Sequence, residues 1–261
     1  MTDHDESEET LAEGSLISHL LELRDRLMRA FIGIFVVFIP LAFFSNKLFT
    51  FIATPLIKKL PPGASIIATS LTAPFMEPIK LAFFTAVFIA APWVLYQIWA
   101  FVSPGLYRRE KRFAVPLLIS SVILFYIGVA FAYYLVFPLT FKFLTSTAPQ
   151  GVLVMTDISA YLSFVLLLFL AFGLAFEIPV ATVLLIWTGL VKVETLTKNR
   201  GYALLIIFII AAVLTPPDAV SQCMMGIPMY LLYEMGIVFS RVLLKDKLAE
   251  RAAGEQENAA S

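Results

Sequence analysis

Three glutamates are the residues of this sequence with the clearest potential for chemistry. Glu22 lies in an amphipathic stretch, Glu110 lies in a loop among four cations, and Glu177 lies inside an apolar run. A carboxylate can accept two parallel N–H bonds from the planar fork of a guanidinium, whereas a lysine ammonium is a compact point charge. The chemistry open to these residues is therefore binding of a cationic or polar group rather than bond making.

Glu22 belongs to a segment, 15–29, with polar residues at helical spacing on one face and leucines on the other. The spacing favours a plain i,i+4 ion pair between Glu22 and Arg26. It favours the same pairing between Asp25 and Arg29. The functional alternative is a carboxylate offered to a cationic ligand at the membrane surface.

Glu110 is the one acid of the segment 103–112, which also holds four arginines and lysines. One interpretation is a solvated loop in which the acid relieves repulsion between its neighbours. The other is that these cations keep Glu110 ionised and in place to bind an incoming guanidinium.

Glu177 lies deep in its apolar segment, where a charge costs at least about 2.5–3.5 kcal/mol on insertion scales. Pro179 lacks an N–H and is expected to bend the helix beside it, which opens space near the acid. Either Glu177 is neutral and hydrogen-bonded within its own bundle, or it binds a group on a partner. Two other acids have structural explanations: Glu234 by pairing near the inner face, and Asp218 as the N-cap of the last helix.

The elements that position these acids must be membrane helices. Apolar residue types make up 60% of the 261 residues and charged types 15%, and the mean hydropathy is +0.88. This composition indicates a polytopic membrane protein and excludes a disordered chain, a nucleic-acid binder and an ordinary cytosolic enzyme. A single cysteine and two histidines, with no P-loop, HExxH or GxSxG motif, give no basis for a metal site, a cofactor or catalysis.

The fold class expected is all-α, with six transmembrane helices in a cupped bundle. The six apolar segments are 27–44, 79–101, 113–137, 161–187, 202–214 and 219–244. The fifth covers only roughly 20 Å of a hydrocarbon core about 30 Å thick, so it is expected to lie in a thinned bilayer or against neighbours. The apolar connections 45–78 and 138–160 are expected to cap the bundle at the outer interface.

The charge distribution predicts the orientation. With six crossings both termini share one side, and that side holds 14 of the 19 lysines and arginines, so both termini are expected in the cytoplasm. The acidic segment 1–14 and the segment 246–261 are expected to be disordered tails around a membrane domain of residues 15–245.

Several strings in this sequence resemble the TatC family, the core subunits of the twin-arginine protein translocase. They include SHLLELRDR at 18–26, YQIWAFVSPGL at 96–106, FEIP at 176–179 and LTPPD at 214–218. Shorter matches lie at 45–46, 54–56, 74–80 and 107–112, so the resemblance covers roughly residues 15 to 245 in order.

This resemblance implies a receptor and scaffold that exports folded proteins across the bacterial cytoplasmic (inner) membrane using the proton-motive force. Glu22 and Glu110 would bind the arginine pair of signal peptides, with Leu20, Arg24 and Phe101 nearby. The residues implied in partner binding or function would be Glu177, Pro55 and Asp218. The implied partners are the single-span subunits TatA and TatB, within a multimeric complex in the lipid bilayer.

Two other functions remain open from the residues alone. The first is a proton-coupled secondary transporter of a small cationic solute, with Glu177 as the coupling acid, although no internal repeat supports it. The second is an intramembrane enzyme, for which no second acid lies deep in another span.

Overall fold

The structure, a computed structural model, describes residues 3–57, 65–102, 111–146, 155–215 and 218–245. It is helical almost throughout, as the composition predicted. The helices are α1 (Asp3–Phe43), α2 (Ser45–Ile57), α3 (Ala73–Val102), α4 (Lys111–Phe131), α5 (Phe137–Ser146), α6 (Ile158–Ala175), α7 (Ile178–Thr188), α8 (Val193–Lys198), α9 (Arg200–Leu214) and α10 (Ala219–Leu243). A π-helical turn, Ala132–Val136, continues α4 into α5.

Five helical stretches are long and apolar enough to cross a membrane. They are Ser18–Phe43, Ala73–Phe101, Val115–Phe143, Ile158–Thr188 and Ala219–Leu243. The remaining predicted segment forms α9, an apolar helix of 15 residues. At 1.5 Å per residue α9 is about 22 Å long, shorter than the hydrocarbon core. A full sixth crossing and the cytoplasmic placement of the termini therefore stay predictions.

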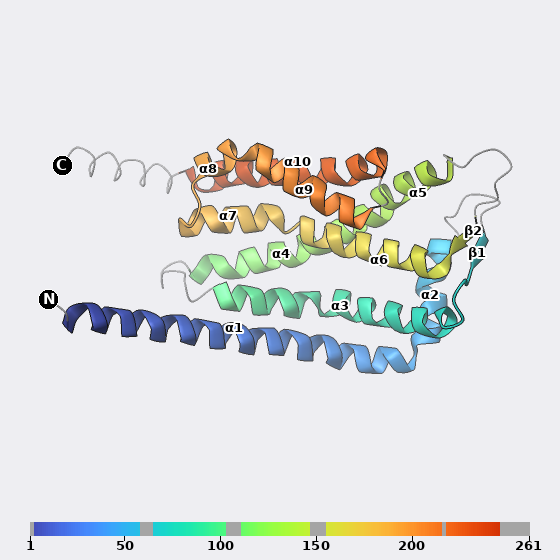
Figure 1. The fold of residues 1–261 in the computed structure, drawn as a ribbon, viewed down its shortest axis with the longest axis horizontal. Coiled ribbons are helices and arrows are strands. Elements are labelled where there is room, and N and C mark those ends of the chain that lie inside the picture. Colours follow the sequence, from blue (N-terminus) through green and yellow to red (C-terminus); the bar gives the residue numbers. More distant parts are fainter. Residues whose placement is uncertain (1–2, 58–64, 103–110, 147–154, 216–217, 246–261) are drawn as a thin grey trace.

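The long helices run side by side, with α1 at the edge of the bundle against α3 (Figure 1). α1 begins and α10 ends at the same end of the molecule, while α2, β1, β2 and α5 gather at the other end. The sequence predicted a disordered tail over residues 1–14, whereas in the structure α1 already begins at Asp3. No proline interrupts residues 3–14, and glutamate, alanine and leucine are good helix formers. The segment 246–261 lies outside the described residues.

The largest cluster of buried apolar side chains comes from the π-helical turn, α5, α6, α9 and α10. Beside it, α4 and α6 approach each other closely. A Cβ added at Gly128 would lie 2.4 Å from the Phe172 carbonyl oxygen, and one at Gly173 would lie 2.7 Å from the Phe125 ring. Helices in a membrane gain little from the hydrophobic effect and associate through close van der Waals packing, which small residues permit. These two glycines therefore fix the distance between α4 and α6.

Replacing Gly128 by alanine is expected to destabilise the protein by about 1–3 kcal/mol, because the new methyl group meets backbone that cannot rotate away. The measurement is thermal unfolding of purified protein in detergent. Gly201→Ala is the matched control: within the described part of the chain, a Cβ there meets nothing within 4 Å. Equal unfolding temperatures for the two variants would contradict this role for Gly128.

The end of the molecule that holds α2 and α5 carries the only extended structure in the described ranges, which the sequence did not predict. Strand β1 (Ser65–Ile67) pairs in parallel with β2 (Met155–Asp157). The Asp157 carboxylate accepts the backbone N–H groups of Ser159 at 2.7 Å and Ala160 at 3.0 Å, which caps α6. It also accepts the Thr69 hydroxyl and, at 3.0 Å, the Thr69 N–H, so it joins the two connections.

These hydrogen bonds give the cap a predicted pH dependence. The bond from the Thr69 hydroxyl, followed by those from backbone N–H groups, lowers the pKa of Asp157 to about 2. Because the pKa is lowered on folding, the stabilisation is complete above the ordinary value near 3.8 and is lost as pH falls toward 2. The protection factors of the Ser159 and Ala160 amides, taken against an unstructured peptide at the same pH, are expected to fall over that interval. Asp157→Ala should show low protection factors at every pH, and unchanged protection in this variant would contradict the capping role.

Candidate functional site

Glu22 lies where α1 packs against the last turns of α3. Its Oε1 is 3.3 Å from Nη2 of Arg26, and Nη1 of Arg26 is 3.5 Å from Oε1 of Gln97 on α3. The predicted Glu22–Arg26 pair is thus confirmed, whereas the predicted Asp25–Arg29 pair is wrong. Asp25 instead bonds Arg24 at 2.9 Å, because both side chains are exposed and adjacent. Glu22 keeps 34% of its side chain exposed and can be reached by a ligand.

Aromatic residues fix the position of α1 along α3. The indole N–H of Trp93 donates to the carbonyl oxygen of Arg29 at 3.0 Å. The Trp93 ring lies against Gly33, where an added Cβ would come within 2.3 Å of Cδ1. Nearer the end of α3, the His19 and Phe101 rings stack at 4.4 Å. The carboxylate of Glu22 is therefore placed by a rigid helix pair rather than by a loop.

The other residues expected at the arginine site are only partly described. Leu20 is 63% exposed, as is most of the Arg24 side chain, and both lie within one turn of Glu22. Glu110 lies outside the described residues. Pro55 falls within α2. This helix lies at the other end of the molecule from the last turns of α3, against which the Glu22 part of α1 packs (Figure 1).

Glu177 lies at the break between α6 and α7. The predicted bend is confirmed, since α6 ends at Ala175 and α7 begins at Ile178, with Pro179 unable to donate to the Ala175 carbonyl. The hydroxyl of Ser121 on α4 donates to Glu177 Oε2. Within the described structure the other oxygen, Oε1, is buried without a hydrogen-bond partner.

The remaining acids have structural partners. Asp218 caps α10 by accepting the Ser221 N–H at 2.7 Å, as predicted. Glu234 is paired, as predicted, and its partners are Arg200 of α9 at 2.7 Å and the Tyr230 hydroxyl at 2.9 Å. This pairing ties α9 to α10 near the end of the molecule at which α1 begins and α10 ends.

Sequence reasoning missed one ion pair, which joins a buried acid to a partly exposed lysine. Glu77 is 4% exposed, and both its carboxylate oxygens accept from Lys80, at 3.0 and 3.1 Å. Lys80 also donates to Ser163 of α6 at 2.9 Å, so the pair links α3 to α6. The i,i+3 spacing of an acid and a lysine was the available signal. In the described ranges, no group of three or more His, Cys, Asp or Glu side chains is placed to hold a metal ion.

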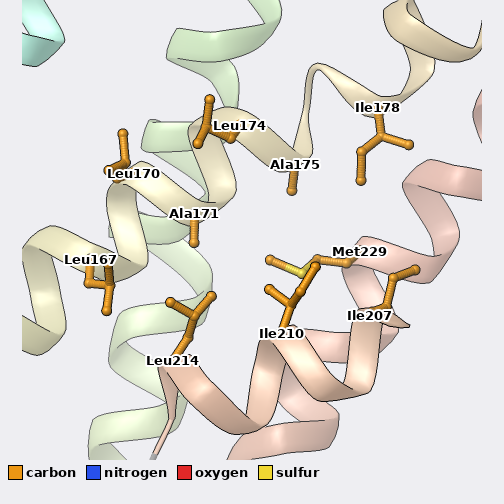
Figure 2. A pocket seen from close by; sticks show the side chains of 10 residues that line it. All are labelled: Leu167, Leu170, Ala171, Leu174, Ala175, Ile178, Ile207, Ile210, Leu214 and Met229. Atoms are coloured by element: carbon orange, nitrogen blue, oxygen red, sulfur yellow. The ribbon is translucent and has the colours of Figure 1, made fainter. Parts of the chain in front are cut away.

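A cavity of about 350 Å³ lies between α6, α9 and α10. Figure 2 shows the ten side chains that line it, all of them apolar. Such a lining offers no hydrogen bond or charge to a cationic solute, so this cavity gives no support to a transporter of small cations.

Comparison with known proteins identifies the family. The sequence profile described as Sec-independent protein translocase protein (TatC) matches residues 18–228. The chain belongs to the TatC family. The TatC protein of Escherichia coli (strain K12) is 53% identical over 226 residues, which are 87% of this chain and 88% of that protein. The TatC protein of Haemophilus influenzae is 54% identical over the same shares of the two chains.

A solved structure supports the same conclusion at the level of the fold. The crystal structure of a twin-arginine translocase receptor, TatC, superposes with a TM-score of 0.78 at 37% identity, covering 86% of this chain and 98% of that one. TatC proteins are components of a protein translocase in the bacterial inner membrane and are not enzymes. The all-α membrane fold and the family predicted from the sequence are therefore confirmed.

Proposed function

We propose that this TatC protein is the receptor and scaffold that binds twin-arginine signal peptides and exports folded proteins across the cytoplasmic membrane. The observation that carries the proposal is the Glu22 carboxylate, which is partly exposed, held by the α1–α3 packing and already in contact with a guanidinium, that of Arg26. A carboxylate positioned this way can accept a second guanidinium from a ligand.

Glu110 is proposed as the second carboxylate of the site. Two acids can each take one guanidinium of an Arg-Arg pair in bidentate fashion. A Lys-Lys pair offers only point charges that hold water strongly, so it would bind less well. We propose that Phe101 of α3 and the exposed Leu20 of α1 contact the apolar stretch that follows the arginines. Arg24, one turn after Leu20 on α1, belongs to the same proposed site.

Glu177 is proposed as the docking point for the single-span subunits TatA and TatB. Its Oε1 is buried and has no partner among the described residues, which is costly unless another molecule supplies one. Pro55 and Asp218 are also proposed as partner-binding or functional residues. Asp218 in addition caps the start of α10. Assembly into a multimeric complex would complete the polar contacts that one copy leaves open.

The energy source proposed is the proton-motive force. The sequence has no P-loop to bind a nucleotide. A buried carboxyl group in the membrane, such as Glu177, is the kind of group through which a proton gradient can act.

The proposal is tested by photo-crosslinking a twin-arginine signal peptide to this protein in membranes, with probes placed beside Glu22. An adduct with the Arg-Arg peptide that is much weaker with the Lys-Lys peptide is expected. Equal adducts with both peptides would contradict arginine recognition. For the transporter alternative, proteoliposomes would have to accumulate a cationic solute under a pH gradient, and no accumulation is expected.

A further inference from the structure

Three side chains from three helices form a buried chain of hydrogen bonds that ends on Glu177. The indole N–H of Trp99 on α3 donates to Ser121 Oγ on α4 at 3.3 Å, and the Ser121 hydroxyl donates to Glu177 Oε2. Trp99 is 7% exposed and Ser121 is 1% exposed. Neither bond involves a residue proposed above for signal-peptide binding.

The chemistry of the three side chains determines which group donates in each hydrogen bond. An indole nitrogen can only donate, so Ser121 must accept from Trp99 with its oxygen. A hydroxyl has one hydrogen, which leaves that hydrogen free to go to Glu177. Trp99 thereby fixes the rotation of the Ser121 hydroxyl, and Ser121 in turn fixes which oxygen of Glu177 is occupied.

The consequence concerns the other oxygen. With Oε2 held by Ser121, the carboxyl group cannot rotate freely, and Oε1 is left buried without a partner in the described structure. We propose that Trp99 and Ser121 are positioning residues, which hold the Glu177 carboxyl in one orientation. Oε1, which this chain now covers, then meets a polar side chain on a single-span partner helix when that helix displaces the covering side chains. This inference rests on the partner role proposed for Glu177 and adds the device that orients it.

Helix packing supplies the required precision. Gly128 lies seven residues after Ser121, on the same face of α4, and allows α4 to touch the backbone of α6 at Phe172. Ser121 consequently reaches the end of α6 at a fixed distance. A partner helix would meet a carboxyl group that is already ordered, which reduces the entropy lost on binding.

The inference is tested with Ser121→Ala in the full chain reconstituted in nanodiscs. Affinity for TatA or TatB is measured through a photoreactive probe at Leu174, which is 55% exposed and lies one turn before Glu177. Affinity is expected to fall about three- to fivefold, the loss of one net hydrogen bond. Ser120→Ala is the matched control and should have no effect, because among the described residues the Ser120 hydroxyl bonds only the Leu117 carbonyl in its own helix. Trp99→Phe is expected to give a smaller loss than Ser121→Ala.

A positioning role differs from a general structural role in its dependence on Glu177. In a Glu177→Ala background, Ser121→Ala should cause no further loss, while signal-peptide binding stays normal throughout and Ser121→Thr, which keeps the hydroxyl, retains affinity. An undiminished three- to fivefold loss in that background, or no loss with Ser121→Ala alone, would overturn the inference. If Glu177→Ala itself leaves affinity unchanged, the proposed partner role falls and this inference falls with it.

Discussion

Replacing Glu22 by glutamine is expected to weaken binding of a twin-arginine signal peptide about 30-fold or more. Removing one member of a desolvated charge pair costs about 2–5 kcal/mol, and the lower end applies because Glu22 is one-third exposed before the ligand arrives. Glutamine keeps the size of the side chain and loses the charge and the bidentate acceptor. Fluorescence anisotropy of a labelled signal peptide, titrated with protein in nanodiscs, measures the change.

Asp25→Asn is the matched control for this result. It removes the same charge from the same helix, three residues away. In the part of the chain that the structure describes, the Asp25 side chain bonds only its exposed neighbour Arg24. A change of about twofold or less is expected, since exposed charge pairs contribute little. Equal losses for Glu22→Gln and Asp25→Asn would show that general surface charge, and not a specific site, attracts the peptide.

Replacing Glu177 by alanine is expected to separate the two activities of the protein. Signal-peptide affinity should stay within twofold of its normal value. Within the described ranges, the Glu177 carboxyl bonds Ser121, and through it Trp99, and shares no hydrogen bond with Glu22 or Arg26. Affinity for the single-span partners should fall about 5- to 30-fold, the value of an interhelical hydrogen bond of about 1–2 kcal/mol in a membrane. Export of a folded reporter protein should fall in parallel.

The thermal stability of the Glu177→Ala variant distinguishes a specific loss of partner binding from misfolding. Alanine removes a buried carboxyl group with one unsatisfied oxygen, so the thermal unfolding temperature should not fall sharply. Loss of signal-peptide affinity together with a lower unfolding temperature would indicate misfolding instead of a specific partner site.

Local patterns in the sequence were sufficient for much of this architecture. The bend at Pro179, the Glu22–Arg26 pair and the cap by Asp218 each depend on residues within four positions of one another. For such features backbone geometry alone relates spacing to contact. The membrane segments follow from apolar run length, which a bilayer imposes directly.

Contacts between distant segments could not be predicted in this way. The Ser121–Glu177 bond joins residues 56 positions apart, and the Arg200–Glu234 pair joins residues 34 positions apart. Likewise the parallel pairing of β1 with β2 brings together two connections far apart in the chain. These contacts depend on which helices and strands pack against each other, and the hydropathy of each segment does not specify its packing partner. The Asp25–Arg29 pair failed for another reason: exposed side chains choose among several partners of similar energy.

The central claim is that Glu22 and Glu110 together bind the two guanidinium groups of the signal. The most direct measurement is a double-mutant cycle, in which Glu22→Gln and Glu110→Gln proteins, singly and together, are titrated with Arg-Arg and Lys-Lys signal peptides. We expect each single variant to remove most of the preference for Arg-Arg, and the double variant to bind both peptides alike. A preference for Arg-Arg that survives in the double variant would contradict the account.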